Sequence, residues 1–98
     1  MASVDQAYED AGKYWNVAPN VLRAVHQVED PKNDPRARSR AGARGYMKFM
    51  PATARSLGID PTDPVQAIYG AASLLAENLK RYGNLPDALR GYTGGTDR

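Results

Sequence analysis

The longest helical pattern in the chain, from Pro64 to Tyr82, constrains the fold more than any other feature. Asp63 precedes it as an N-cap residue and Gly83 follows it as a stop signal. Its apolar residues recur at intervals of three or four, the repeat of one helix face. They are Val65, Ile68, Ala72, Leu75 and Leu79. A stripe of this length has to be covered by other elements, so we expect it to make the largest contribution to the core.

Capping residues, prolines and glycines divide the remaining chain into shorter helical segments. We expect these segments at residues 4–16, 22–29, 51–57 and 84–89, and the second of them restarts the helical pattern at Pro19. Ser3 and Gln6 form a capping box for the first segment, and Pro19 and Pro51 suit the first turns of the next two. No segment shows the sustained alternation of a half-buried strand. The predicted fold class is therefore all-α, a single helical domain with about five helices and no substantial sheet.

Composition narrows the kinds of site that the chain can build. It has 98 residues, no cysteine and one histidine. A domain of this size has a small core, and the composition excludes disulfides and zinc–thiolate sites. We therefore expect no metal and no cofactor. The net charge of +2 and the pI of about 9.0 are too weak to indicate a nucleic-acid partner by themselves.

The 98 residues include no signal peptide and no run of about 18 apolar residues, so we expect no membrane span. The last stretch, Thr93 to Arg98, has the composition of a loop. We expect residues 1–98 to be one module of a longer protein, monomeric as an isolated domain. Any delivery to a compartment would then depend on sequence outside this chain.

Glu29 is the first candidate for chemistry because of its position on a helix face. Leu22 and Val25 precede it by seven and four positions, so the three residues lie in one line. Desolvation favours the protonated form of a carboxyl group, which is the form that a general acid needs. The alternative is that Glu29 lies at the edge of the stripe, reaches water and only ends the helix before Pro31. Helix geometry alone favours this second interpretation.

The loop after Glu29 carries a cluster of four arginines: Arg36, Arg38, Arg40 and Arg44. Such guanidinium groups can grip carboxylates or phosphates, nucleic acid included. The alternative, which the sequence favours, is a solvated loop. Asp30 is best explained as a helix-ending group that hydrogen-bonds the loop. His26 lies one turn before Glu29 and is a candidate to interact with it, but a single exposed histidine on a helix is more often uninvolved, which is the favoured interpretation.

Three blocks of the sequence together resemble a known family. They are residues Val25 to Glu29, Asn33 to Ala54, and Gly91 to Gly95. In these blocks the chain resembles the catalytic domain of soluble lytic transglycosylases, which is related to goose-type lysozyme. The resemblance runs from about residue 14 to residue 95 and rests on a long central block rather than on one short motif.

The resemblance implies a lysozyme-like helical fold, a groove for peptidoglycan glycan strands, and Glu29 as the catalytic acid/base. The carboxyl group would protonate the glycosidic oxygen between N-acetylmuramic acid and N-acetylglucosamine. As a carboxylate it would then take the proton of the C6 hydroxyl, which closes a 1,6-anhydro ring. Because the substrate supplies the nucleophile, one carboxyl group serves both steps. The implied setting is the cell envelope or periplasm, or a phage virion or secretion-associated protein, and a nucleic-acid partner is not expected.

Further positions match groove positions of the family, namely Ser39, Tyr46, Met47, Lys48, Tyr92 and Thr93. The chain also departs from the family pattern. Asp30 stands where serine is usual, Lys48 where glutamine is usual, and Thr93 where asparagine is usual. Two main interpretations stay open: a lytic transglycosylase whose activity these changes reduce, and a peptidoglycan-binding or structural module that has kept the fold without catalysis. A hydrolysing lysozyme is a further alternative.

Overall fold

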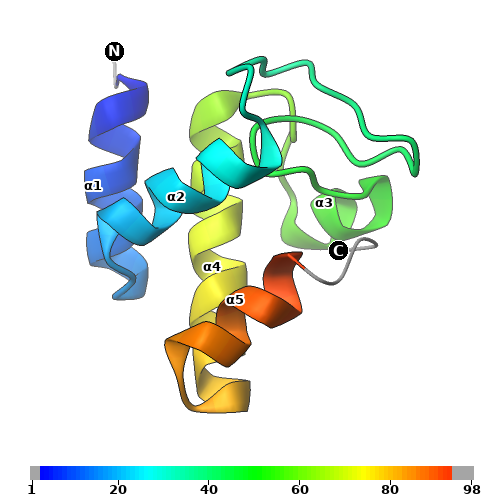
Figure 1. Cartoon of the computed structure of the whole chain (residues 1–98). Helices are drawn as coiled ribbons and strands as arrows, with labels where there is room; N and C mark the ends of the chain where they lie inside the picture. Colours follow the sequence, from blue (N-terminus) through cyan, green and yellow to red (C-terminus); the bar gives the residue numbers. More distant parts are fainter. Residues whose placement is uncertain (1–2, 94–98) are drawn as a thin grey trace.

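The structure of the chain is a computed structural model that describes residues 3–93, with Thr93 described for its backbone only. This range contains the helices α1 (Val4–Trp15), α2 (Pro19–Glu29), α3 (Pro51–Leu57), α4 (Pro64–Tyr82) and α5 (Leu85–Thr93) (Figure 1). Within it, extended pairing is limited to isolated bridges among residues 38, 44 and 49. The predicted all-α class is confirmed. Across residues 3–93, no helix combines the length and the apolar character needed to cross a bilayer.

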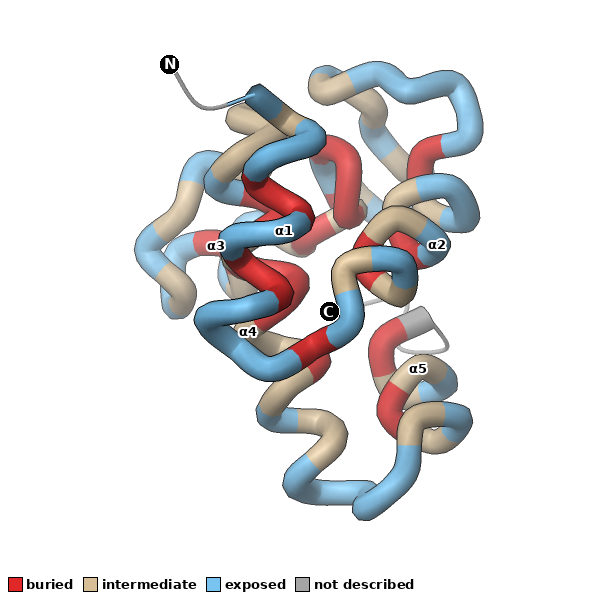
Figure 2. The backbone as a smooth tube through the Cα atoms, turned by 90° about the vertical axis from the view of Figure 1, so that its left-hand side faces the viewer, coloured by how far each residue is buried: buried red, intermediate tan, exposed pale blue. Residues whose placement is uncertain are grey.

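α4 is the axis around which the other helices are arranged. α1 and α5 pack against it, and α2 crosses in front of it and packs on α1 (Figure 1). Ile68, Ala72 and Leu75 are completely buried, and each large apolar side chain buried in this way stabilises the fold by about 1.5–3 kcal/mol. Val65 and Leu79 are partly buried and pack against the same core. Figure 2 shows the buried stretches of the helices turned toward a common interior. The predicted contribution of the α4 stripe is confirmed.

The expected helix starts and stops lie close to where the structure has them. The Ser3 hydroxyl accepts the N–H of Gln6 at 3.0 Å, which completes the N-terminal cap of α1. The Asp63 carboxylate accepts the first free N–H groups of α4. α3 and α4 each end at a glycine with positive φ, at Gly58 and Gly83. These signals work because each one satisfies helix-end groups that have no partner inside the helix.

The end of α5 differs from the prediction. The sequence favours a helix through Leu89 followed by a glycine-flanked turn around Tyr92, whereas α5 continues through Gly91 to Thr93. Glycine disfavours a helix by about 1 kcal/mol, so local propensity indicates a stop here. The tertiary contact outweighs it: Tyr92 is completely buried, and its hydroxyl donates to the Met47 carbonyl at 3.0 Å.

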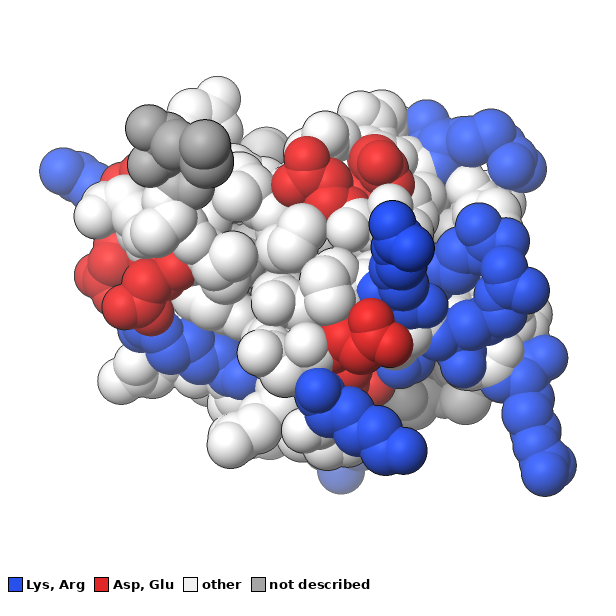
Figure 3. All heavy atoms as spheres, turned by 90° about the horizontal axis from the view of Figure 1, so that it is seen from above, with Lys and Arg blue, Asp and Glu red and all other residues white. Residues whose placement is uncertain are grey.

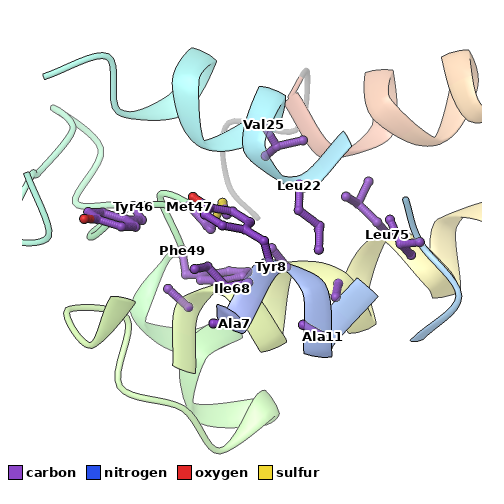
Figure 4. Close-up of a cluster of buried hydrophobic side chains, with 14 of the residues drawn as sticks. Ala7, Tyr8, Ala11, Leu22, Val25, Tyr46, Met47, Phe49, Ile68 and Leu75 are labelled. Carbon is purple, nitrogen blue, oxygen red and sulfur yellow. The ribbon is translucent and has the colours of Figure 1, made fainter. Parts of the chain in front are cut away.

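A long connection joins α2 to α3 and spans residues 30–50. Its far end is anchored in the core by Met47 and Phe49, both completely buried. Figure 4 shows these two side chains in the cluster with Ile68, and Tyr46 at the edge of that cluster. The connection is therefore fastened to the core just before α3 begins, which holds its middle part as a loop beside the end of α2 (Figure 1).

Candidate functional site

Glu29 is the last residue of α2. Leu22 and Val25, which precede it on the same face, point into the core (Figure 4) and are buried. Glu29 itself is only partly buried. The predicted stripe is thus confirmed for its two apolar members, and Glu29 lies at the edge of it, where a helix end meets the loop.

Lys48 connects the long loop to this helix end. Its Nζ donates to the main-chain carbonyl of Glu29 at 3.0 Å. That carbonyl is one of the last in α2, which lack partners within the helix, and a cation there also interacts favourably with the helix dipole. Lys48 has a φ of +52°, a left-handed conformation that is uncommon for a lysine. The contact sets the position of the end of α2 relative to the loop.

Replacing Lys48 by methionine is expected to lower the free energy of unfolding by about 1–2 kcal/mol, because the variant keeps an apolar stem but leaves a partly buried carbonyl without its charged donor. Urea unfolding of parent and variant measures the loss. Lys32→Met is the matched control, since Lys32 is exposed and forms no hydrogen bond or ion pair with the described residues. Equal losses in the two variants would mean that the contact with Glu29 contributes nothing.

The side chains of Tyr8, His26 and Asp30 form a polar network at the end of α2, where Asp30 directly follows Glu29. Asp30 is 3% exposed, and its carboxylate oxygen lies 3.2 Å from His26 Nε2. The Tyr8 hydroxyl lies 2.6 Å from the other ring nitrogen, His26 Nδ1. With an ionised Asp30 and a neutral imidazole, Nε2–H donates to the carboxylate and Nδ1 accepts from Tyr8. The His26 ring also stacks on Tyr46 with 3.8 Å between centroids. His26 is therefore the central member of this polar network. The prediction that His26 is an uninvolved side chain is wrong.

Asp30 ends α2 as predicted, but its carboxylate is buried and bonds His26 of α2 rather than the loop, as the sequence had suggested. The available signal is the spacing of four residues between His26 and Asp30, which places the two side chains on one helix face. Burial is the main cause that raises the pKa of the neighbouring Tyr46 hydroxyl, and the charge of Asp30 raises this pKa further. Together with Tyr8, these residues line an open depression of about 680 Å³ between α1 and the start of the loop.

Tyr8→Phe is expected to weaken the dependence of stability on pH above pH 10. Burial, and to a lesser degree Tyr46, raises the pKa of Tyr8 to about 12, whereas an unfolded tyrosine titrates near 10. Between these values the folded chain keeps the proton and the unfolded chain loses it, so the stability of the parent falls as the pH rises from about 10 to 12. Phenylalanine has no such proton, so the variant should lose less stability over this window.

Thermal unfolding of the parent and Tyr8→Phe at pH 9 and pH 11 measures this difference. Tyr14→Phe serves as the control because Tyr14 is 76% exposed. The same pH slope in the parent and in Tyr8→Phe would contradict the prediction.

The structure gives internal contacts for the residues that the sequence assigns to a groove. Tyr46, Met47 and Tyr92 are buried in the core. The Ser39 hydroxyl accepts the N–H of Ala43 at 3.0 Å and closes a turn in the loop. The side chain of Thr93 lies outside the described residues. Substrate contacts of these residues stay predictions, and the contacts that the structure does show hold the loop in place next to Glu29.

Metal-ligating side chains do not gather near Glu29. Among residues 3–93, no group of three or more His, Cys, Asp or Glu side chains is arranged so that it could hold a metal ion.

Two comparisons relate the chain to known proteins. The family model described as the transglycosylase SLT domain matches residues 6–98. A protein of Enterobacteria phage PRD1 described as "Transglycosylase" is 48% identical over 89 residues, which cover 90% of this chain and 33% of the phage protein. The chain thus spans about a third of the length of this relative. Since the family match includes nearly every described residue, from the first turn of α1 to the end of α5, the chain belongs to the transglycosylase SLT domain family.

Proposed function

We propose that this domain is a peptidoglycan lytic transglycosylase in which Glu29 is both general acid and general base. The observation that carries the proposal is the position of Glu29 within a chain of this family: it ends α2, is partly exposed, and has its main chain held by Lys48. The name of the phage relative supports the same reaction class.

The reaction proceeds in two proton transfers. Protonated Glu29 gives its proton to the glycosidic oxygen between N-acetylmuramic acid and N-acetylglucosamine, and the C1–O bond breaks with positive charge developing on the sugar ring. The C6 hydroxyl of the same sugar then bonds to C1 while Glu29, now a carboxylate, takes its proton. The product is a 1,6-anhydro-muramoyl end, and Glu29 is again protonated. No water is consumed, so one carboxyl group is sufficient.

Two of the three departures from the family pattern are accommodated in the fold. The Asp30 carboxylate is bonded to His26, and the Lys48 ammonium group is bonded to the Glu29 carbonyl. Each of these side chains therefore has a partner that holds the end of α2 in place. This favours an active enzyme over a module that has kept the fold without catalysis.

Digestion of purified sacculi, followed by mass spectrometry of the soluble fragments, tests the proposal. We expect anhydro-muropeptides, with none produced by Glu29→Gln. Fragments with reducing ends would show a hydrolysing lysozyme instead. A parent protein that sediments with sacculi but releases no fragments would be a binding module, and the enzymatic proposal would fail.

The phage origin of the relative supports one further part of the proposal. The domain would act on the peptidoglycan of a cell envelope as part of a longer phage protein. An antibody against residues 3–93 would test this setting on purified phage particles. We expect it to detect the domain in them, and its absence from the particles would contradict this part of the proposal.

A further inference from the structure

The loop between α2 and α3 presents its arginines on one outward side. We call Arg36, Arg38, Arg40 and Arg44 the arginine array. All four are exposed, whereas Ala37 and Ser39, which alternate with the first three, are partly buried. This alternation turns the side chains of the array away from the molecule, as in the outer side of an extended segment. Figure 3 shows basic side chains gathered over the side of the molecule where this loop lies.

Arg38 and Arg44 form an antiparallel pair that brings two like charges together. The flanking hydrogen bonds run from Ser39 N to Ala43 O at 2.8 Å and from Gly45 N to Ala37 O at 2.9 Å. This pattern makes Arg38 and Arg44 a non-hydrogen-bonded pair, the kind in which the side chains are closest. Like charges directly opposite each other destabilise such a pair. A bound anion would remove that repulsion.

The array has no counter-ions within the described part of the chain. Arg23 pairs with Asp5 and Glu9, and Arg90 pairs with Asp87. By contrast, none of the four guanidinium groups of the array forms an ion pair or side-chain hydrogen bond with residues 3–93. Between residues 31 and 45 the chain has five cations and a single acid, although its overall net charge is only +2. The positive charge is therefore concentrated on this loop.

The array is physically joined to the end of α2. Its loop begins directly after Glu29, and its far end returns to Glu29 through the bond from Lys48. The backbone of Arg44 pairs with that of the buried Phe49 through two hydrogen bonds of 2.8 and 3.0 Å. The guanidinium groups consequently project from a segment whose far end is fixed in two ways. Phe49 is buried in the core, and the neighbouring Lys48 is bonded to the Glu29 carbonyl. A polymer that runs along the molecule from Glu29 would meet the loop that carries the array, which lies beside the end of α2 (Figure 1).

We propose that the arginine array binds the free carboxylates of the peptide stems that branch from peptidoglycan glycan strands. The inference rests on the proposed function, which places such a strand at Glu29. Guanidinium groups bind carboxylates through two parallel hydrogen bonds, and neighbouring stems along a strand offer repeated carboxylates to several arginines. The array thereby distinguishes stem-bearing glycan from bare glycan, and it acts in binding rather than in the bond-breaking step.

Sedimentation with sacculi tests the proposal without any need for catalysis. The protein would contain Glu29→Gln throughout, and the sacculi would be either native or treated with carbodiimide and ammonia, which converts their carboxylates into amides. We expect Arg38→Gln/Arg44→Gln to weaken binding to native sacculi by about tenfold, and to have little effect on binding to amidated sacculi. Circular dichroism and thermal unfolding would verify that the variants are folded.

Lys80→Gln/Arg81→Gln is the matched control. It removes the same charge from two exposed positions at the end of α4 that make no ion pair with the described residues. An equal loss in this control would indicate non-specific attraction and overturn the proposal, as would an equal loss on amidated sacculi. If the array variant lost only binding to duplex DNA, with the steep salt dependence of phosphate contacts, the partner would be nucleic acid and the proposal would also fail.

An activity measurement separates this inference from the proposed function. With an active Glu29, the array variant should cleave glycan strands stripped of peptides by an amidase as fast as the parent, and cleave native sacculi more slowly at low substrate concentration. If the parent released no anhydro products from either substrate, the proposed function would fail, while the sedimentation result would still decide whether the array binds carboxylates.

Discussion

Glu29→Gln is expected to reduce the release of anhydro-muropeptides by at least about 10³-fold, because general acid and base catalysis contributes roughly 10²–10⁴-fold and this residue serves in both roles. Glutamine has nearly the same shape but neither donates a proton as an acid does nor accepts one as a carboxylate does. The bond from Lys48 is made to the main chain of Glu29 and is retained. We therefore expect the free energy of unfolding to change by less than about 1 kcal/mol.

Initial rates of product release from sacculi, together with urea unfolding, measure the two effects. Glu77→Gln provides the control, because Glu77 is an exposed acid on α4 and its replacement should leave the rate unchanged. If Glu29→Gln kept a tenth of the parent rate, the proton donor would be another group and the assignment of Glu29 would be wrong.

Gly45→Ala is expected to destabilise the fold by about 3 kcal/mol or more, the largest effect on stability that we predict for a change of one methyl group. A Cβ atom at this position would lie 1.7 Å from the carbonyl oxygen of Pro61, and Gly45 has a φ of +86°. Both obstacles involve the backbone, so a rotation of a side chain cannot relieve them. Either the loop or the segment before α4 has to move, and Met47 and Phe49 would be pulled from their places in the core.

Gly42→Ala measures the cost of a left-handed backbone conformation without the steric clash that Gly45→Ala adds. Gly42 has a φ of +96°, but a Cβ atom there would meet nothing within 4 Å. Its replacement should cost only the left-handed conformation, about 1–2 kcal/mol. Urea unfolding of both variants gives the difference. Equal costs would mean that the approach of Gly45 to Pro61 is not a tight contact in solution.

The helices could largely be predicted because their determinants are local. Asp63 and Gly83 mark the two ends of α4 through groups that lie within one turn of each end, and the stripe between them needs only a count along the sequence. The resemblance to the family indicates Glu29 as the catalytic residue, whereas its position on the helix alone favours a residue that only ends the helix. Its catalytic role stays a prediction until the variant is measured.

The arrangement around Glu29 could not be predicted in the same way, because it depends on contacts between distant segments. Lys48 reaches Glu29 across 19 positions, and the loop has no periodicity that would indicate the contact. The hydrogen bond between the Tyr8 hydroxyl and His26 joins α1 to α2 across 18 positions of the sequence. Gly91 suggests a helix end, whereas the burial of Tyr92 and its bond to the Met47 carbonyl explain why α5 continues. Local patterns describe each of these residues, but not its partner.

The hydrogen bond from Tyr92 to the Met47 carbonyl spans 45 positions of the chain, and it has a consequence for synthesis on the ribosome. The loop beside Glu29 obtains this anchor only when the last turn of α5 has been made and has docked on α4. Contacts of such long range form late, since the intervening chain has to be closed into a loop first. A nascent chain that already contains Glu29 and Lys48 therefore still lacks the bond from Tyr92 to Met47. The loop gains this anchor only when the last helix has formed.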